Sequence, residues 1–243
     1  MNTIAKKVTR GVVLDAFSEI RSVLKFNRHL SGDKGAFLRK MCETESIFIH
    51  IPKTAGKSIF QGLYGIGLHE SFGHAGVDAY LSILGPRKFN KFFKFAFVRN
   101  PWDRLYSAFR FASNGSFGSE NGILFQNEIK DMTFSEFVKD WLDSSKVDKY
   151  IILKPQSDFV CDSAGDLLLD KVCYFENIDN EYRELCLLLG KTKDMPHINK
   201  SQSTSHYQDV YDSEMIDVVL ELYAVDIELF GYGFNGKTNL IDA

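Results

Sequence analysis

The segment that most constrains this chain is residues 46–58, which read SIFIHIPKTAGKS. Its first residues are mostly apolar and β-prone, so they predict a short buried strand. Pro52 ends that strand because proline has no N–H for a sheet ladder, and Gly56 permits a tight backbone turn. Beyond the loop, Ile59, Phe60 and Leu63 share one helical face. The segment therefore predicts a strand, a small-residue loop and a helix start.

A unit of this kind predicts an anion site at its loop. The N–H groups at a helix start are unpaired, and the helix dipole favours negative charge there. Side-chain donors from Lys53, Thr54, Lys57 and Ser58 add to these groups. We therefore expect the loop to hold a phosphate group.

Composition places the chain among ordinary globular proteins. It has 243 residues, of which 44% are hydrophobic and 25% charged, enough for one α/β domain with a sizeable core. A net charge of -3 gives no reason to expect nucleic acid or an anionic membrane as partner. No signal peptide or membrane-spanning segment is expected. The four cysteines lack metal-site spacing, which predicts buried thiols in a reducing compartment, the cytoplasm, and no metal.

The rest of the chain alternates helical patterns with short apolar runs. Residues 1–45 are expected to form an N-terminal helical extension, with an amphipathic packing helix at 8–26 and a loop at 27–45. Residues 92–98 predict a second strand, and residues 113–127 a flexible insertion. Further helices are expected at 77–84, from 101, at 133–142, 181–189 and 212–229, with short strands near 167–169 and 171–175.

The second strand ends in Val98-Arg99-Asn100, and this ending separates two kinds of phosphate site. Gly56-Lys57-Ser58 matches the end of a Walker A loop, but Ile51 stands where its first glycine belongs. A Walker enzyme also needs an acidic magnesium partner, whereas Arg99 is a cation. Lys53 and Arg99 on neighbouring strand ends suit a nucleotide phosphorylated at two places. Alternatively, Arg99 forms a structural ion pair with Asp103 or Glu176.

These residues resemble the Golgi-type carbohydrate sulfotransferases, the family that includes the uronosyl 2-O-sulfotransferases and bacterial relatives. Ile51-Pro52-Lys53-Thr54-Ala55-Gly56-x-Ser58 is similar to the family's 5′-phosphosulfate loop, and residues 95–109 to its 3′-phosphate segment. Segments 155–158, 175–177, 196–201 and 226–232 also resemble the family. The resemblance implies a sulfotransferase domain over 46–243, with a single P-loop-like α/β fold and a central parallel sheet flanked by helices.

The resemblance also implies a donor and its ligands. The donor is 3′-phosphoadenosine 5′-phosphosulfate (PAPS), and the acceptor a hydroxyl, most simply of a carbohydrate. Lys53 would face the 5′-phosphosulfate, and Arg99 and Ser107 the 3′-phosphate. The remaining implied donor-binding residues are Thr54, Ala55, Gly56, Lys57 and Ser58, with Lys200 and Ser201 closing over the nucleotide. The family usually has Thr or Ser at position 57, so Lys57 either adds a phosphate contact or points outward.

The acceptor hydroxyl needs a general base, for which a neutral histidine is suited near pH 7. The candidates are His69, His74, His197, His206 and the carboxylate of Glu70. Gly73-His74 matches the position of a family histidine, so the resemblance implies His74. Two other functions stay open on the residues alone: a P-loop kinase or NTPase, and a non-catalytic module that binds nucleotide or glycan.

Overall fold

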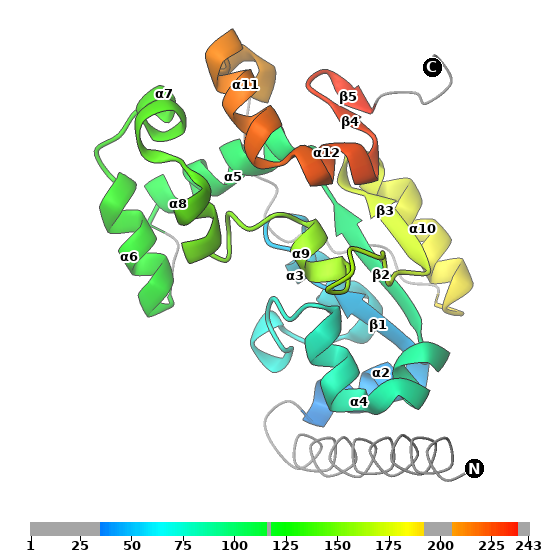
Figure 1. Ribbon diagram of the computed structural model, residues 1–243. Helices are drawn as coiled ribbons and strands as arrows, with labels where there is room; N and C mark the ends of the chain where they lie inside the picture. Colours follow the sequence, from blue (N-terminus) through cyan, green and yellow to red (C-terminus); the bar gives the residue numbers. More distant parts are fainter. Residues whose placement is uncertain (1–34, 116–117, 192–205, 238–243) are drawn as a thin grey trace, which may run out of the picture.

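Three parallel strands form the centre of the fold (Figure 1). The computed structural model describes residues 35–115, 118–191 and 206–237. Its sheet has the order β1-β2-β3, with Phe48 opposite Phe95 and Phe97 opposite Cys173. The predicted central parallel sheet is therefore confirmed. The strands are β1 (Ser46–Ile49), β2 (Phe93–Val98) and β3 (Lys171–Tyr174).

The aromatic strand residues explain why this sheet is buried. All four residues of β1 are buried, and so are five of the six in β2. The rings of Phe48 and Phe95 stack with centroids 5.3 Å apart. A parallel sheet is covered on both faces, and apolar runs without alternation are the sequence pattern that results. Because the strands are parallel, their carboxyl ends lie at one edge of the sheet.

The chain between β1 and β2 is helical. It contains α3 (Gly56–Ile59), the π-helical turn η1 (Phe60–Tyr64), the 3-10 turn η2 (Leu68–Glu70) and α4 (Val77–Lys91). The helix predicted at 77–84 is present and is interrupted at Gly85, where the backbone leaves helical geometry. Gly85 takes a φ of 76°, and the chain resumes a helix through Lys91 after this kink.

The prediction of a loop at 27–45 is wrong for residues 35–44, which are the helical part of this range that the structure describes. Residues Gly35–Thr44 form helix α2, in which Phe37, Leu38 and Met41 are fully buried. These side chains recur at helical spacing and pack in the same core as β1, and the Phe37 ring meets Phe60 edge-on at 5.3 Å. The neighbouring glycines suggested a loop, but burial of this face favours the helix. The helix expected at 8–26 lies outside the described residues.

A second hydrophobic core lies to one side of the sheet, around helix α5 (Pro101–Ser113) (Figure 1). The prediction of a flexible insertion at 113–127 is wrong from residue 120 onward, because residues 120–129 form helix α6. Ser119 caps that helix, and Phe125 and Ile129 are fully buried. The helix predicted at 133–142 begins at a capping box formed by Thr133 and Glu136. The other elements are α6 (Glu120–Ile129), α7 (Phe134–Glu136), η3 (Phe137–Trp141), α8 (Ser144–Lys149) and α9 (Ser157–Val160).

The last third of the chain returns across the sheet edge. The helix expected at 212–229 is two helices, because Tyr223 leaves helical geometry and donates its hydroxyl to the Leu153 carbonyl at 2.7 Å. The strand expected at 167–169 reduces to one bridge between Cys161 and Leu167. The remaining elements are η4 (Phe175–Asn177), α10 (Ile178–Leu188), η5 (Tyr207–Val210), α11 (Ser213–Leu222), α12 (Ala224–Phe230), β4 (Tyr232–Gly233) and β5 (Gly236–Lys237).

Asp226 joins this C-terminal region to the sheet edge. Its carboxylate is fully buried and accepts the backbone N–H groups of Gln156 at 2.7 Å and Ser157 at 2.8 Å. Within the described ranges, no helix is both long enough and apolar enough to cross a bilayer.

We expect Asp226→Ala to lower the free energy of unfolding by roughly 2–4 kcal/mol, because it leaves two buried N–H groups without acceptors. Urea denaturation followed by circular dichroism measures this. Asp217→Ala, at an exposed position of α11, is the matched control and should change stability by less than about 0.5 kcal/mol. Equal effects of the two substitutions would contradict the role given to Asp226.

Candidate active site

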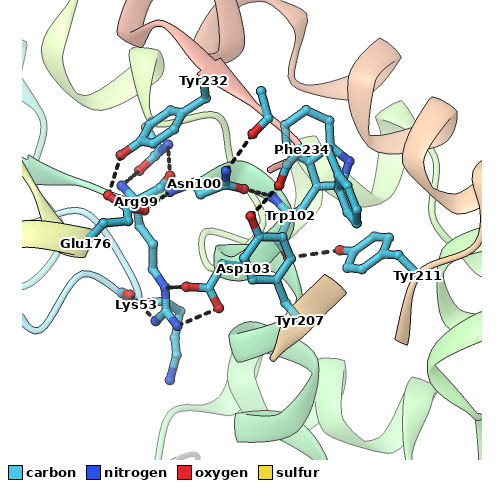
Figure 2. Close-up of polar contacts among 12 residues, drawn as sticks. Lys53, Arg99, Asn100, Trp102, Asp103, Glu176, Tyr207, Tyr211, Tyr232 and Phe234 are labelled. Atoms are coloured by element: carbon cyan, nitrogen blue, oxygen red, sulfur yellow. Dashed lines mark hydrogen bonds and ion pairs between the residues drawn. The ribbon is translucent and has the colours of Figure 1, made fainter. Parts of the chain in front are cut away.

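Arg99 joins the ends of the first two strands. It follows β2, and its Nη1 donates to the Lys53 carbonyl at 3.0 Å (Figure 2). Its Nε and Nη2 donate to the two carboxylate oxygens of Asp103, at 2.7 and 2.9 Å. The ion pair weighed in the sequence is thus present, with Asp103 as partner. Three of the five guanidinium N–H groups are engaged, so two are left for an anion.

Lys53 is a half-buried cation without a carboxylate. In the described part of the chain no Asp or Glu lies within ion-pair distance of it, and its ammonium sits 3.9 Å from the ring centroid of Phe111. Burial, with the positive charges of Arg99 and Lys57, lowers the pKa of Lys53 from 10.5 to about 8. An anion bound here would relieve both the burial cost and the repulsion.

The loop that carries Lys53 has a backbone suited to the same task. Lys53 and Ala55 have φ values of 69° and 63°, in the left-handed region that non-glycine residues seldom adopt. Alternation of φ sign along a loop turns successive N–H groups toward one side, which forms an anion-binding concavity. Thr54 between them is fully buried, and its hydroxyl donates to the Ile51 carbonyl at 2.9 Å. Thr54 therefore stabilises the loop with its side chain.

Gly56 is required by a neighbouring ring rather than by the turn we expected it to permit. Its φ is not in the left-handed region, but a Cβ at this position would lie 1.8 Å from His50 Nε2. His50 is 4% exposed. The two lysines of the loop differ in position, since Lys57 is exposed and Lys53 half-buried, while Ser58 is buried.

His74 is held against the same loop in a defined tautomer. Its Nδ1 lies 3.0 Å from the His50 carbonyl oxygen. A carbonyl only accepts, so Nδ1 carries the proton and Nε2 is left as an acceptor. Burial and the charge of Lys53 lower the pKa of His74, although the bond to the His50 carbonyl opposes the shift. The ring is therefore neutral at pH 7, as a general base requires.

Gln156 and Glu176 hold this site in place through contacts that the sequence did not predict. Gln156 is fully buried; its Oε1 accepts the Arg99 N–H and its Nε2 donates to the Arg99 carbonyl, both at 2.9 Å. Glu176 accepts the Asn100 N–H at 2.6 Å and the Tyr232 hydroxyl at 2.9 Å (Figure 2). Each stands in a segment that resembles the family, and for Gln156 that resemblance was the only sequence signal. Glu176 was also weighed as an ion-pair partner of Arg99, but it accepts the Asn100 N–H while Asp103 pairs with Arg99.

The remaining predicted residues are placed as follows. Ser107 is half-buried on α5, one turn after Asp103 and so on the helix face that holds Arg99. Lys200, Ser201 and the base candidate His197 lie outside the described residues. Among the other base candidates, His69 and His206 are exposed, and Glu70 accepts the Gly67 N–H at 2.6 Å.

The comparisons with known proteins identify the family. A model of the Sulfotransferase family matches residues 78–233, which is more than half of the chain. The chain belongs to the Sulfotransferase family. The match includes Arg99, Ser107 and the segments of Gln156 and Glu176, and it begins after Lys53 and His74. No curated protein and no solved structure shows significant similarity to the chain. The family supports a sulfotransferase activity.

We expect Gly56→Ala to lower the free energy of unfolding by roughly 1–3 kcal/mol, because the added methyl overlaps the buried His50 ring. Urea denaturation measures this effect. The double variant His50→Ala/Gly56→Ala removes the overlapping ring and should show a favourable coupling energy of at least about 1 kcal/mol in a double-mutant cycle. Additive effects of the two substitutions would show that the ring does not account for the glycine.

Proposed function

We propose that this protein transfers a sulfuryl group from PAPS to an acceptor hydroxyl, with Lys53 at the leaving phosphate and His74 as general base. The observation that carries the proposal is the hydrogen bond of 3.0 Å that the Arg99 guanidinium donates to the Lys53 backbone carbonyl. It brings two cations from separate strand ends to one edge of the sheet, in a chain of the Sulfotransferase family.

The charges of Lys53 and Arg99 complement those of PAPS. PAPS carries negative groups at its 5′ and 3′ positions, and a cation with N–H groups still available to an anion is suited to each. Lys53 has no carboxylate partner in the described residues, and Arg99 keeps two N–H groups after binding Asp103 and the loop carbonyl. We assign Lys53 to the 5′-phosphosulfate, and Arg99 with Ser107 to the 3′-phosphate. The loop residues Thr54, Ala55, Gly56 and Ser58 would offer backbone N–H groups, and exposed Lys57 a peripheral charge.

When bound, PAPS supplies the sulfuryl group. His74 Nε2 removes the proton of the acceptor hydroxyl as its oxygen bonds to sulfur. The bond between sulfur and the 5′-phosphate oxygen breaks, and the Lys53 ammonium neutralises the charge that develops on that oxygen. No metal is needed for this charge balance in the proposal. We extend the proposal to a carbohydrate acceptor, from the resemblance, and to the cytoplasm, which the four free cysteines support.

We expect wild-type protein to bind 3′,5′-adenosine bisphosphate, and Lys53→Ala to weaken that binding roughly 10–100-fold through loss of a charge-assisted contact. Isothermal titration calorimetry measures both. Lys57→Ala is the matched control from the same loop and should change the dissociation constant by less than about threefold. Absence of binding by wild type would refute the donor assignment. Binding of ATP with magnesium but not of the bisphosphate would indicate the kinase alternative.

We expect His74→Ala to lower kcat roughly 10²–10⁴-fold while bisphosphate affinity stays within about twofold, because only the proton acceptor is lost. Transfer of labelled sulfate from PAPS measures kcat, and calorimetry measures affinity. His69→Ala, at an exposed position nearby in the sequence, is the control and should keep wild-type kcat. Equal turnover of the two variants would exclude His74 as the base.

We expect opposite pH limits from the two residues. His74 has a lowered pKa, so kcat should fall only at pH values below 6.5, as its ring becomes protonated. Lys53 loses its charge as pH rises through about 8, so bisphosphate affinity should weaken above that pH. Calorimetry between about pH 6 and pH 10 tests the upper limit, and Lys53→Ala should remove it. A wild-type affinity that is flat across this range would contradict the role of Lys53.

A further inference from the structure

A groove of about 700 Å³ opens beside His74 and lies away from the donor cations. His74 and Gly76 line one end of it, and the other walls come from residues 151–165 and 221–225. Lys53 and Arg99 are not among its lining residues. The candidate base thus lines this groove and also lies near the charge of Lys53, so an acceptor hydroxyl bound in the groove would be next to it.

The groove is preformed by buried contacts. A Cβ on Gly76 would lie 3.1 Å from the Phe159 carbonyl, so the loop of His74 packs directly on the backbone of α9. Arg104, which is 2% exposed, donates to the Lys154 carbonyl at 2.7 Å. With the bonds from Asp226 to the start of α9, these contacts fix both walls. A groove fixed in this way can select among acceptors.

The charge of the groove is opposite to that of the donor loop. Four carboxylates line it, and they face one lysine and the neutral His74. That lysine, Lys154, lies 3.9 Å from the Asp158 carboxylate, which leaves the other three without a lining cation. Burial, and then the charges of Asp226 and Asp148, raise the pKa of Asp158, against the effect of Lys154. The lining carboxylates are Asp78, Asp158, Asp162 and Glu221.

The groove also has exposed aliphatic side chains. Ile151 is 44% exposed and Val225 62% exposed, and both line it. Aliphatic side chains of this kind pack against the C–H faces of a sugar ring or a comparable apolar face. A polyanionic acceptor would meet carboxylates along the wall, whereas a cationic group would be attracted to them.

We propose that this groove binds the acceptor, and that the acceptor is a hydroxyl compound bearing a positively charged amine, of the amino-sugar class, rather than a polyanion. The proposal rests on the proposed function, since it places the acceptor hydroxyl next to His74. It narrows the substrate class from any hydroxyl compound to cationic ones.

The test is calorimetry with three β-1,4-linked tetramers that differ in charge: cationic glucosamine, neutral N-acetylglucosamine and anionic glucuronic acid. Each is titrated at low ionic strength into protein with 3′,5′-adenosine bisphosphate. We expect the glucosamine tetramer to bind at least about tenfold more tightly than the glucuronic acid tetramer, and added salt to reduce the difference. The variant Asp162→Asn/Glu221→Gln keeps side-chain size and should reduce the preference at least about threefold. Asp217→Asn/Glu228→Gln, with both positions exposed and outside the groove, is the matched control and should keep it.

The outcomes separate this proposal from the donor assignment. Tighter binding of the glucuronic acid tetramer, equal binding of all three, no binding of any, or a preference that Asp162→Asn/Glu221→Gln leaves unchanged would each overturn the acceptor class. Failure of the proposed function appears elsewhere, as absence of bisphosphate binding in the first titration. Amine preference in protein that does not bind the bisphosphate would support the groove and refute the donor.

Discussion

The rest of the site depends on the placement of the Arg99 guanidinium. Asp103 holds it by two bonds, and it in turn holds the Lys53 carbonyl, so one side chain joins α5, the end of β2 and the loop after β1. The Gln156 side chain forms hydrogen bonds with the backbone N–H and carbonyl of Arg99. A bidentate arginine pair fixes direction as well as distance. The loop lysine is therefore held near a second cation, at a cost that a bound anion would offset.

Positive charge gathers at the loop of Lys53, and negative charge at the groove that His74 lines. His74 lies close enough to Lys53 for that charge to lower its pKa, and it also lines the groove that four carboxylates border and that excludes Lys53 and Arg99. The His74 ring stays neutral because burial and the nearby lysine both disfavour its protonated form. Proton acceptance by Nε2 then follows from the bond that Nδ1 makes to the His50 carbonyl. Anionic donor and cationic acceptor would each meet complementary charge.

The sequence predicted the elements whose signals are local. The apolar runs of β1 and β2 and the helix starts at Pro101 and after Thr133 have signals that are complete within a few residues. It failed where packing outweighed a local signal. Glycines before α2 and α6 suggested loops, yet each helix has a buried apolar face. Tyr223 interrupts a continuous helical pattern, and its hydroxyl donates to the distant Leu153 carbonyl.

By itself the sequence determined the central parallel sheet and the family resemblance, because strand patterns and turn residues act over short range. It also gave Lys53, Arg99 and His74 as candidates. Only the tertiary structure decided how they are held, since Gln156 reaches Arg99 across 57 positions and the His50 carbonyl reaches His74 across 24. The reason for Gly56, a ring packed from His50, and the acidic groove beside His74 likewise exist only where distant segments meet.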